Sequence, residues 1–170
     1  LPPKLVLKHL RQGAVIPEHP LALNHKRKLD EKCQRALTRY YITAGAGGMA
    51  VGVHTTQLAI HDPKVGLLKP ILELASETLD AFAPKESLPL IRVAGICGPR
   101  RQALAEATIA VGLGYHAGLL HLGDGLDHLS SHKLLQYVRA IAEVIPVFGV
   151  FRQPAMGGIP LPYSFWREFV

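Results

Sequence analysis

The sequence has few of the features that mark secreted, disulfide-bonded or membrane-spanning proteins. It contains two cysteines, Cys33 and Cys97, which are too far apart for a C-x-x-C pair, so neither a disulfide framework nor a zinc site built on paired cysteines is indicated. No apolar run approaches the ~18 residues of a membrane span. Residues 1–9 also lack the apolar core of a secretory signal. We therefore expect a cytoplasmic protein, with no membrane partner, in which both thiols are reduced and buried.

The sequence also lacks a recognisable nucleic-acid-binding surface. Lysine and arginine number 19 against 13 acidic residues, which gives a net charge of +6. These basic residues are scattered, and Lys26-Arg27-Lys28 is the longest run. Aromatic residues do not alternate with them, as they do in a stacking surface for bases. We predict a solvated basic surface without a nucleic-acid partner, whose positive field favours small carboxylate substrates.

Apolar runs of strand length are present, and they alternate with segments of helical period along the chain. Hydrophobic residues make up 48% of the sequence, which is typical of a globular chain. The alternation indicates repeated βα units around a parallel sheet. The expected strands lie at residues 14–16, 49–53, 90–96, 117–122 and 146–151, and the expected helices at residues 30–44, 67–82, 99–111 and 130–145, with a further helix beginning at 162.

The first expected helix has an amphipathic pattern, and a glycine-rich turn follows it. Cys33, Leu37 and Tyr41 share a stripe that we expect to face the core. The turn that follows, residues 45–48, has a G-x-G-G pattern. A dinucleotide fingerprint follows a strand and opens a helix, whereas this turn follows a helix and opens a strand. We interpret the glycines as a helix C-cap and predict no dinucleotide site.

The nine histidines raise the question of a metal site. His128 and His132 are spaced i, i+4, with Asp124 and Asp127 nearby. This spacing is weaker than H-E-x-x-H and straddles the expected start of a helix. We interpret these residues as polar loop and first-turn residues and predict no metal. Neither a G-x-S-x-G nucleophile motif nor a P-loop is present.

A polar loop directly after the second expected strand is the most informative motif. The strand Gly48–Gly52 runs into Val53-His54-Thr55-Thr56-Gln57. This loop resembles the substrate-carboxylate loop of the dihydrodipicolinate synthase and N-acetylneuraminate lyase family. Two further segments share the resemblance, residues 16–24 and residues 151–158.

The resemblance runs from about Ala14 to the end of the chain and implies a (β/α)8 TIM barrel. We expect residues 1–13 to be an amino-terminal extension and residues 14–170 to be a partial barrel with about the first five βα units. A closed barrel needs eight strands and about 250 residues, and an open sheet leaves an unpaired edge. We therefore expect a fragment, a truncated reading frame or a protein that a partner completes.

The resemblance also implies a function. Members of the family are lyases that condense or cleave 2-oxo acids through a lysine Schiff base, without metal or organic cofactor, as homo-oligomers. It implies that Thr55 and Thr56 bind the carboxylate of pyruvate or a similar 2-oxo acid. The donors of such a pair suit an anion. His54, His61 and His121 are candidates for lining the barrel mouth, as ordinary hydrogen-bonded residues or as substrate contacts.

The sequence departs from the family where the acid–base chemistry is expected. Phe151 occupies the position of the family tyrosine, and a phenyl ring cannot transfer a proton. Met156 stands where synthases of the family have an arginine, and Arg152 is expected to point away from the face of Phe151. No lysine falls at an expected strand position in the core, although a Schiff base needs an amine in an apolar interior. We expect this chain to be incomplete or inactive as an aldolase. The alternative is a non-catalytic barrel relic or a partner-dependent interaction protein.

Overall fold

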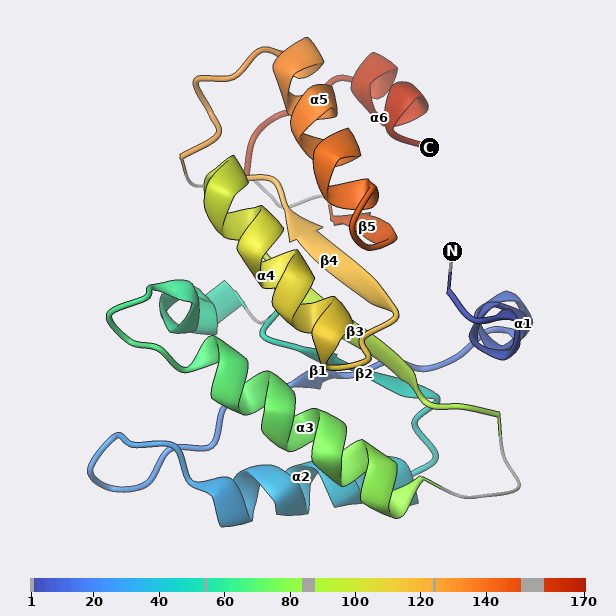
Figure 1. The fold of residues 1–170 in the computed structure, drawn as a ribbon, viewed down its shortest axis with the longest axis vertical. Coiled ribbons are helices and arrows are strands. Elements are labelled where there is room, and N and C mark those ends of the chain that lie inside the picture. The colour runs from blue at the N-terminus through green and yellow to red at the C-terminus, as the bar shows by residue number, and fades with distance from the viewer. Residues whose placement is uncertain (1, 54, 84–87, 124, 151–157) are drawn as a thin grey trace.

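The chain folds into five consecutive parallel strands with helices between them (Figure 1). The computed structural model describes residues 2–53, 55–83, 88–123, 125–150 and 158–170, and describes residues 55–57 by their backbone alone. The strand order in the sheet follows the order in the chain. The strands are β1 (Glu18–His19), β2 (Gly48–Val51), β3 (Ile91–Ile96), β4 (Ala117–His121) and β5 (Val147–Val150). The α/β architecture predicted from the alternating pattern is confirmed.

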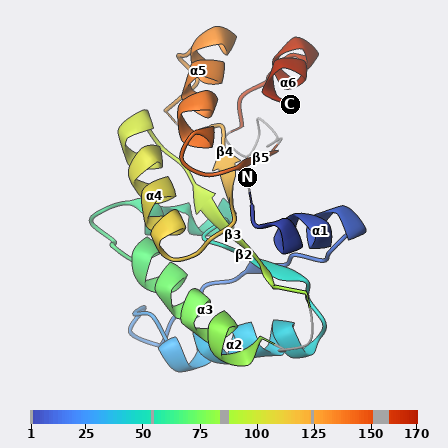
Figure 2. The same cartoon turned by 45° about the vertical axis from the view of Figure 1, so that its right-hand side comes forward.

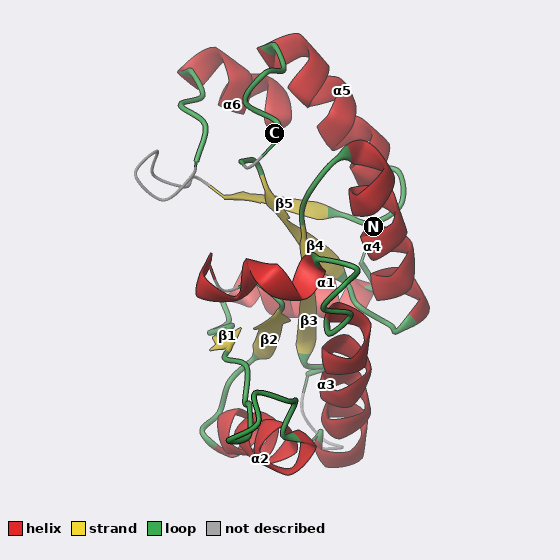
Figure 3. Cartoon of the chain, turned by 90° about the vertical axis from the view of Figure 1, so that its left-hand side faces the viewer, coloured by secondary structure: helices red, strands yellow, loops and turns green. Residues whose placement is uncertain are grey.

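Most of the helices cover one face of this sheet. Figure 3 shows α3, α4 and α5 following one another along the same side of the sheet. The helices after the first strand are α2 (Glu31–Thr43), α3 (Leu68–Phe82), α4 (Arg100–Gly112), α5 (Ser131–Ala142) and α6 (Tyr163–Phe169), and a 3-10 helix, η1 (Thr55–His61), follows β2. The main hydrophobic core lies between these helices and the sheet, and includes Met49, Leu72, Ile96, Leu120 and Ile141. Side-chain caps begin α2 and α5. The amide of Cys33 donates to the Asp30 carboxylate, and the amide of Lys133 donates to the Ser130 hydroxyl oxygen.

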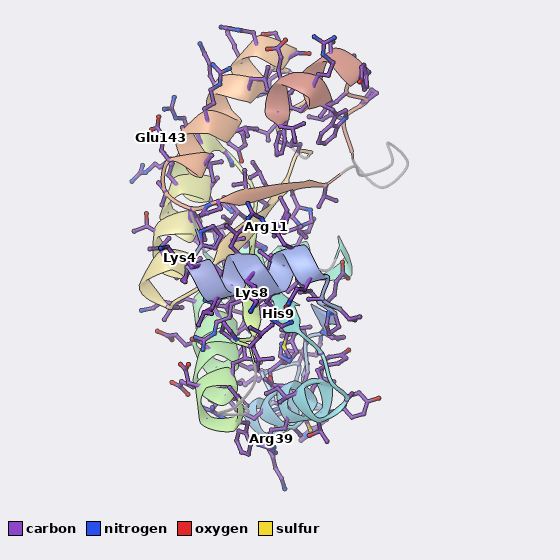
Figure 4. The ribbon with its side chains drawn as sticks, turned by 90° about the vertical axis from the view of Figure 1, so that its right-hand side faces the viewer. Lys4, Lys8, His9, Arg11, Arg39 and Glu143 are labelled. Atoms are coloured by element: carbon purple, nitrogen blue, oxygen red, sulfur yellow. The ribbon has the colours of Figure 1, made fainter. Side chains whose placement is uncertain are left out.

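The helix α1 (Lys4–Gln12) lies on the opposite face of the sheet from α3 and α4 (Figure 2). Val6, which is 1% exposed, joins a second apolar cluster with Val53, Ile91 and Val93. The other side of α1 carries the exposed residues Lys4, Lys8 and Arg11 (Figure 4). Residues 4–12 thus form an amphipathic helix that buries its apolar side on the sheet.

The first strand begins later than the sequence predicted. The expected strand at residues 14–16 is wrong, because the ladder pairs Glu18 with Ala50 and His19 with Val51. The preceding segment still follows β2, since Val15 O accepts from Gly47 N and Pro17 O accepts from Ala50 N. Pro17 and Pro20 flank the strand and have no amide hydrogen, so they limit its length.

The orientation of α2 also differs from the prediction. Cys33 is exposed and Cys97 is partly exposed, so the prediction of two buried thiols is wrong. The residues that α2 buries are Gln34 and Thr38, at 0% and 1% exposure, which is a stripe one residue away from Cys33 and Leu37. Their burial is stabilised by hydrogen bonds to the ring of His19, a polar contact that a hydrophobic pattern does not record.

Within the described residues, no helix is long and apolar enough to cross a membrane.

Candidate functional site

The carboxyl ends of the strands gather several polar side chains at one edge of the sheet. Parallel strands end at the same edge, where barrels of this type place their active sites. The helix η1 follows β2, Cys97 follows β3, and His121 is the last residue of β4. We therefore take this edge as the candidate site.

The two threonines predicted to bind a carboxylate are the first two residues of η1. Their backbone thus lies at the expected edge of the sheet, and their side chains lie outside the part of the chain that the structure describes. Phe151, Arg152 and Met156 also lie outside the described residues. Their predicted roles remain predictions.

The turn between β2 and η1 depends on two glycines. Gly52 has a positive φ of 73°, a conformation that few residues other than glycine adopt. Gly95 of β3 lies against it, and a Cβ at Gly95 would come within 2.0 Å of Gly52 O. This close approach seats η1 directly beside the end of β3.

Three side chains from separate elements meet behind this turn. His61 ends η1, Cys97 follows β3, and Glu106 lies on α4. One donor atom from each, the imidazole nitrogen, the thiol sulfur and a carboxylate oxygen, lies within 4.8 Å of the other two. His61 and Glu106 are each 5% exposed, so two ionisable groups are almost fully removed from water.

Hydrogen bonds fix the ring of His61 and the carboxylate of Glu106. His61 Nε2 donates to Gly52 O at 2.8 Å, and His61 Nδ1 lies 3.0 Å from Glu106 Oε1. Glu106 Oε2 accepts from the amide of Cys97 at 2.9 Å. Gln102 Nε2 donates to Glu106 Oε1 at 2.8 Å and to His61 O at 3.2 Å. We call His61, Cys97, Gln102 and Glu106 the carboxyl-edge cluster.

The environment of His61 favours its charged form. Burial alone lowers the pKa of His61, but hydrogen bonds to Cys97 and Glu106 and the charges of these two groups outweigh burial and raise its pKa to about 10. His61 therefore carries its second ring proton at neutral pH when nothing else is bound, with Nδ1 3.0 Å from the Glu106 carboxyl group.

The turn after Cys97 is anchored from α5. Tyr137 OH donates to Gly98 O at 2.9 Å. Burial, with the charges of Cys97 and Glu106, raises the pKa of Tyr137 above its usual value, so its hydroxyl stays protonated as the donor. The position of Cys97 is thus set by α4 through Glu106 and by α5 through Tyr137.

A cavity of about 370 Å³ opens beside the carboxyl-edge cluster. Its lining combines polar groups from η1, β4 and the loop after β3, and consists of Leu58, His61, Asp62, Pro63, Cys97, Gly98, Gln102, His121 and Gly123. Of the three histidines predicted to line this edge, His61 and His121 do so, and His54 lies outside the described residues.

The sequence singled out a different group of histidines for metal binding. His128 and His132 are exposed, His132 bonds Gln136 at 3.1 Å, and α5 begins at Ser131. The interpretation of these two residues as loop and first-turn residues is confirmed.

Sequence reasoning did not find Glu106, Gln102 or Cys97 as site residues. A signal for Glu106 was present, because it lies in α4 on the same stripe as Ala103, Ala107 and Ala110, which are all 0% exposed. A carboxylate on an apolar helix stripe has to find a buried partner.

Comparisons with known proteins support the fold. Neither a protein-family model nor a curated protein matches the sequence. The chain is similar to YagE from E. coli K12, a prophage protein of the dihydrodipicolinic acid synthase family solved with pyruvate, at 18% identity and a TM-score of 0.76, over 92% of this chain and 50% of that one. It also resembles a Ruminococcus gnavus sialic acid aldolase, at 21% identity and a TM-score of 0.72, over 91% of this chain and 49% of the aldolase chain. A third similar structure is the Fusobacterium nucleatum N-acetylneuraminate lyase with pyruvate. Its sequence is 15% identical and its TM-score is 0.74, over 92% of this chain and 50% of the lyase chain.

The chain has the fold of half such a barrel. It spans about half the length of the structures it matches, as expected for five consecutive βα units. The resemblance to the dihydrodipicolinate synthase and N-acetylneuraminate lyase family is therefore confirmed in fold. At these identities the likeness extends to the fold alone.

Proposed function

We propose that this chain provides the carboxylate-binding part of a lyase or aldolase that acts on pyruvate or another 2-oxo acid. The observation that carries the proposal is the position of Thr55 and Thr56, which begin η1 at the carboxyl edge of the sheet in a fold shared with lyases of that type. Two of the similar structures, YagE and the Fusobacterium nucleatum lyase, were solved in complex with pyruvate. The net charge of +6 also favours an anionic substrate.

A Schiff base with the substrate needs an amine that does not come from the lysines the structure describes. These eight side chains, at positions 4, 8, 26, 28, 32, 64, 69 and 133, are all exposed. An exposed amine lacks the apolar surroundings that activate a Schiff-base lysine as a nucleophile. Phe151, at the position of the family tyrosine, offers no proton to move. The imine step therefore requires groups outside the described residues. We propose that it takes place in the homo-oligomer that the resemblance implies, in the cytoplasm that the sequence pattern predicts.

The second candidate function is a non-catalytic relic that keeps the fold and an anion site. The observation that favours it is Phe151 in place of a proton-transferring side chain. A relic of this kind binds pyruvate without forming a covalent bond to it.

Pyruvate binding and borohydride trapping on the intact native protein test both candidates. If Thr56 donates to the carboxylate, Thr56→Val raises the Kd for pyruvate by about 10- to 100-fold, because a charge-assisted hydrogen bond is worth about 1.5–3 kcal/mol. Thr43→Val, at an exposed position on α2, should leave the Kd unchanged.

The trapping result separates the two candidates. Borohydride reduces an imine to a stable secondary amine, so an aldolase gains the mass of reduced pyruvate on one lysine. Binding that depends on Thr56 but leaves no adduct supports the relic. A native protein that neither binds pyruvate nor gains an adduct would overturn the proposed function.

A further inference from the structure

The carboxyl-edge cluster has a feature that the 2-oxo acid proposal does not use. His61, Cys97 and Glu106 come from three separate places in the fold, and each offers one electron-pair donor within 4.8 Å of the other two. In the proposed function, Thr55 and Thr56 bind the carboxylate without any of these three side chains. The convergence therefore calls for its own explanation.

The hydrogen bonding of His61 leaves Nδ1 facing Glu106, where either a proton or a metal ion can lie between the two groups. Gly52 O can only accept, so the ring proton of His61 lies on Nε2, which donates to it. In the neutral ring Nδ1 then presents a lone pair, and it does so 3.0 Å from Glu106 Oε1. Two lone pairs at that distance repel unless a proton or a metal ion lies between them.

We propose that His61 Nδ1, Cys97 Sγ and Glu106 Oε1 bind a divalent first-row transition metal ion, for which zinc is the best match. Zinc takes imidazole nitrogen, thiolate and carboxylate oxygen as ligands at about 2.0–2.3 Å in tetrahedral geometry. Tetrahedral bonds of that length separate the donors by about 3–4 Å. Here His61 Nδ1 and Glu106 Oε1 lie 3.0 Å apart, and the ligand atoms of the three residues all lie within 4.8 Å of one another. These separations bracket the expected range.

The groups around the donors have the arrangement expected around a bound metal. A metal-binding histidine donates its other ring nitrogen to a carbonyl or carboxylate, as His61 does to Gly52. Glu106 is held by the amide of Cys97 and by Gln102. A thiolate and a carboxylate together also neutralise a divalent ion, so the occupied site carries no net charge into the protein interior.

The site has three protein ligands and opens to the 370 Å³ cavity that His61 and Cys97 line. A closed structural zinc site has four protein ligands, whereas three ligands leave a position for water or a substrate oxygen. The cavity thus gives the ion access to small molecules. The sequence predicted no metal, because these ligands come from three distant segments and have no motif spacing.

Metal titration of the intact native protein, first stripped with a chelator, tests the proposal. We expect one zinc ion per chain. Cobalt should give the charge-transfer absorption of a cobalt–thiolate bond. Cys97→Ser should abolish that band and weaken zinc binding, while Cys33→Ser, at the exposed cysteine on α2, should change neither. Gln102→Ala, which removes only a supporting group, should weaken zinc binding by about 10- to 100-fold.

A second measurement needs no variant. Zinc should protect Cys97 from alkylation and leave Cys33 fully reactive, as read by mass spectrometry of the two peptides. A stripped protein that takes up no stoichiometric zinc, or that binds it equally with Cys97→Ser, would overturn the proposal. The occupant between His61 and Glu106 would then be a proton.

Discussion

At the scale of single residues, the buried ring of His19 has its protonation state set by α2. Gln34 Nε2 donates to His19 Nδ1 at 2.8 Å. The ring proton therefore lies on Nε2, which donates to Thr38 Oγ1 at 3.1 Å, and Thr38 Oγ1 donates to the carbonyl of Gln34. A second proton on the ring would break the first of these bonds.

This network predicts a loss of stability in mild acid. Burial lowers the pKa of His19 from 6.5 to about 4, so between these values the unfolded chain binds a proton that the folded chain does not. The contribution of His19 is fully present above pH 6.5 and is lost as the pH falls toward 4, by up to about 3 kcal/mol. Urea unfolding across this range measures it.

The variant His19→Asn isolates this effect, because the asparagine oxygen can still accept from Gln34. Its free energy of unfolding should depend less on pH between 4 and 6.5 than that of the native protein. His25→Asn, at an exposed position, serves as the control and should leave the pH dependence unchanged. Equal slopes for all three proteins would show that His19 titrates normally.

These residue-level contacts are also where prediction from sequence was weakest. Hydrophobic periodicity finds the face a helix buries when that face is apolar, as in α3. It misses Gln34 and Thr38, which are buried because of a hydrogen-bond partner 15 and 19 residues away. Glu106 and Cys97 were missed for the same reason, since each is fixed by a contact across the fold.

At the scale of elements, α1 stabilises the sheet face that the other helices leave open. Its Val6 is 1% exposed, whereas the adjacent Leu5 is 59% exposed. Val6→Ala should lower the free energy of unfolding by about 1–3 kcal/mol, because it removes buried methyl groups and leaves a cavity. Leu5→Ala should change it by no more than about 0.5 kcal/mol. Thermal or urea unfolding of both variants makes the comparison.

The outcome bears on the predicted boundary between residues 1–13 and the barrel. If both substitutions lower the free energy of unfolding equally little, α1 contributes little to the stability of the barrel. Residues 1–13 would then be an extension outside the barrel domain. We propose instead that α1 folds as part of the barrel domain. The sequence could predict an amphipathic segment here, but it could not say which sheet face the segment covers.

Strand positions were predictable to different degrees. The runs that became β3 and β4 are long and apolar, and they matched within two residues. β1 contains only Glu18 and His19, and nothing in its composition indicates a strand. β1 forms because the carbonyl groups of Val15 and Pro17, just before it, accept hydrogen bonds from the backbone of the β2 segment. The strand therefore depends on a contact between distant parts of the chain.

At the scale of the whole molecule, the sheet should be most stable at its centre. β3 pairs with both β2 and β4, and five of its six residues are buried. Among the described residues, β5 pairs with β4 alone and has no buried residue. Amide hydrogen exchange in β5 should be about 100-fold or more faster than in β3, since local opening exposes an edge strand first.

Exchange measured by mass spectrometry on the intact native protein tests this expectation. The peptide covering β2 is a useful internal reference, because that strand also has two neighbours. Protection of β5 equal to that of β3 would contradict the prediction. It would mean that another segment or another chain pairs with the outer edge of β5.

The order of the strands has a consequence for how the molecule forms. Each strand lies beside the strand that precedes it in the chain, so every new βα unit emerging from the ribosome finds its neighbour already synthesised. Pairing between successive units closes short loops and avoids waiting for distant segments. The molecule can therefore grow in one direction during translation, with the newest strand serving at each moment as the template for the next.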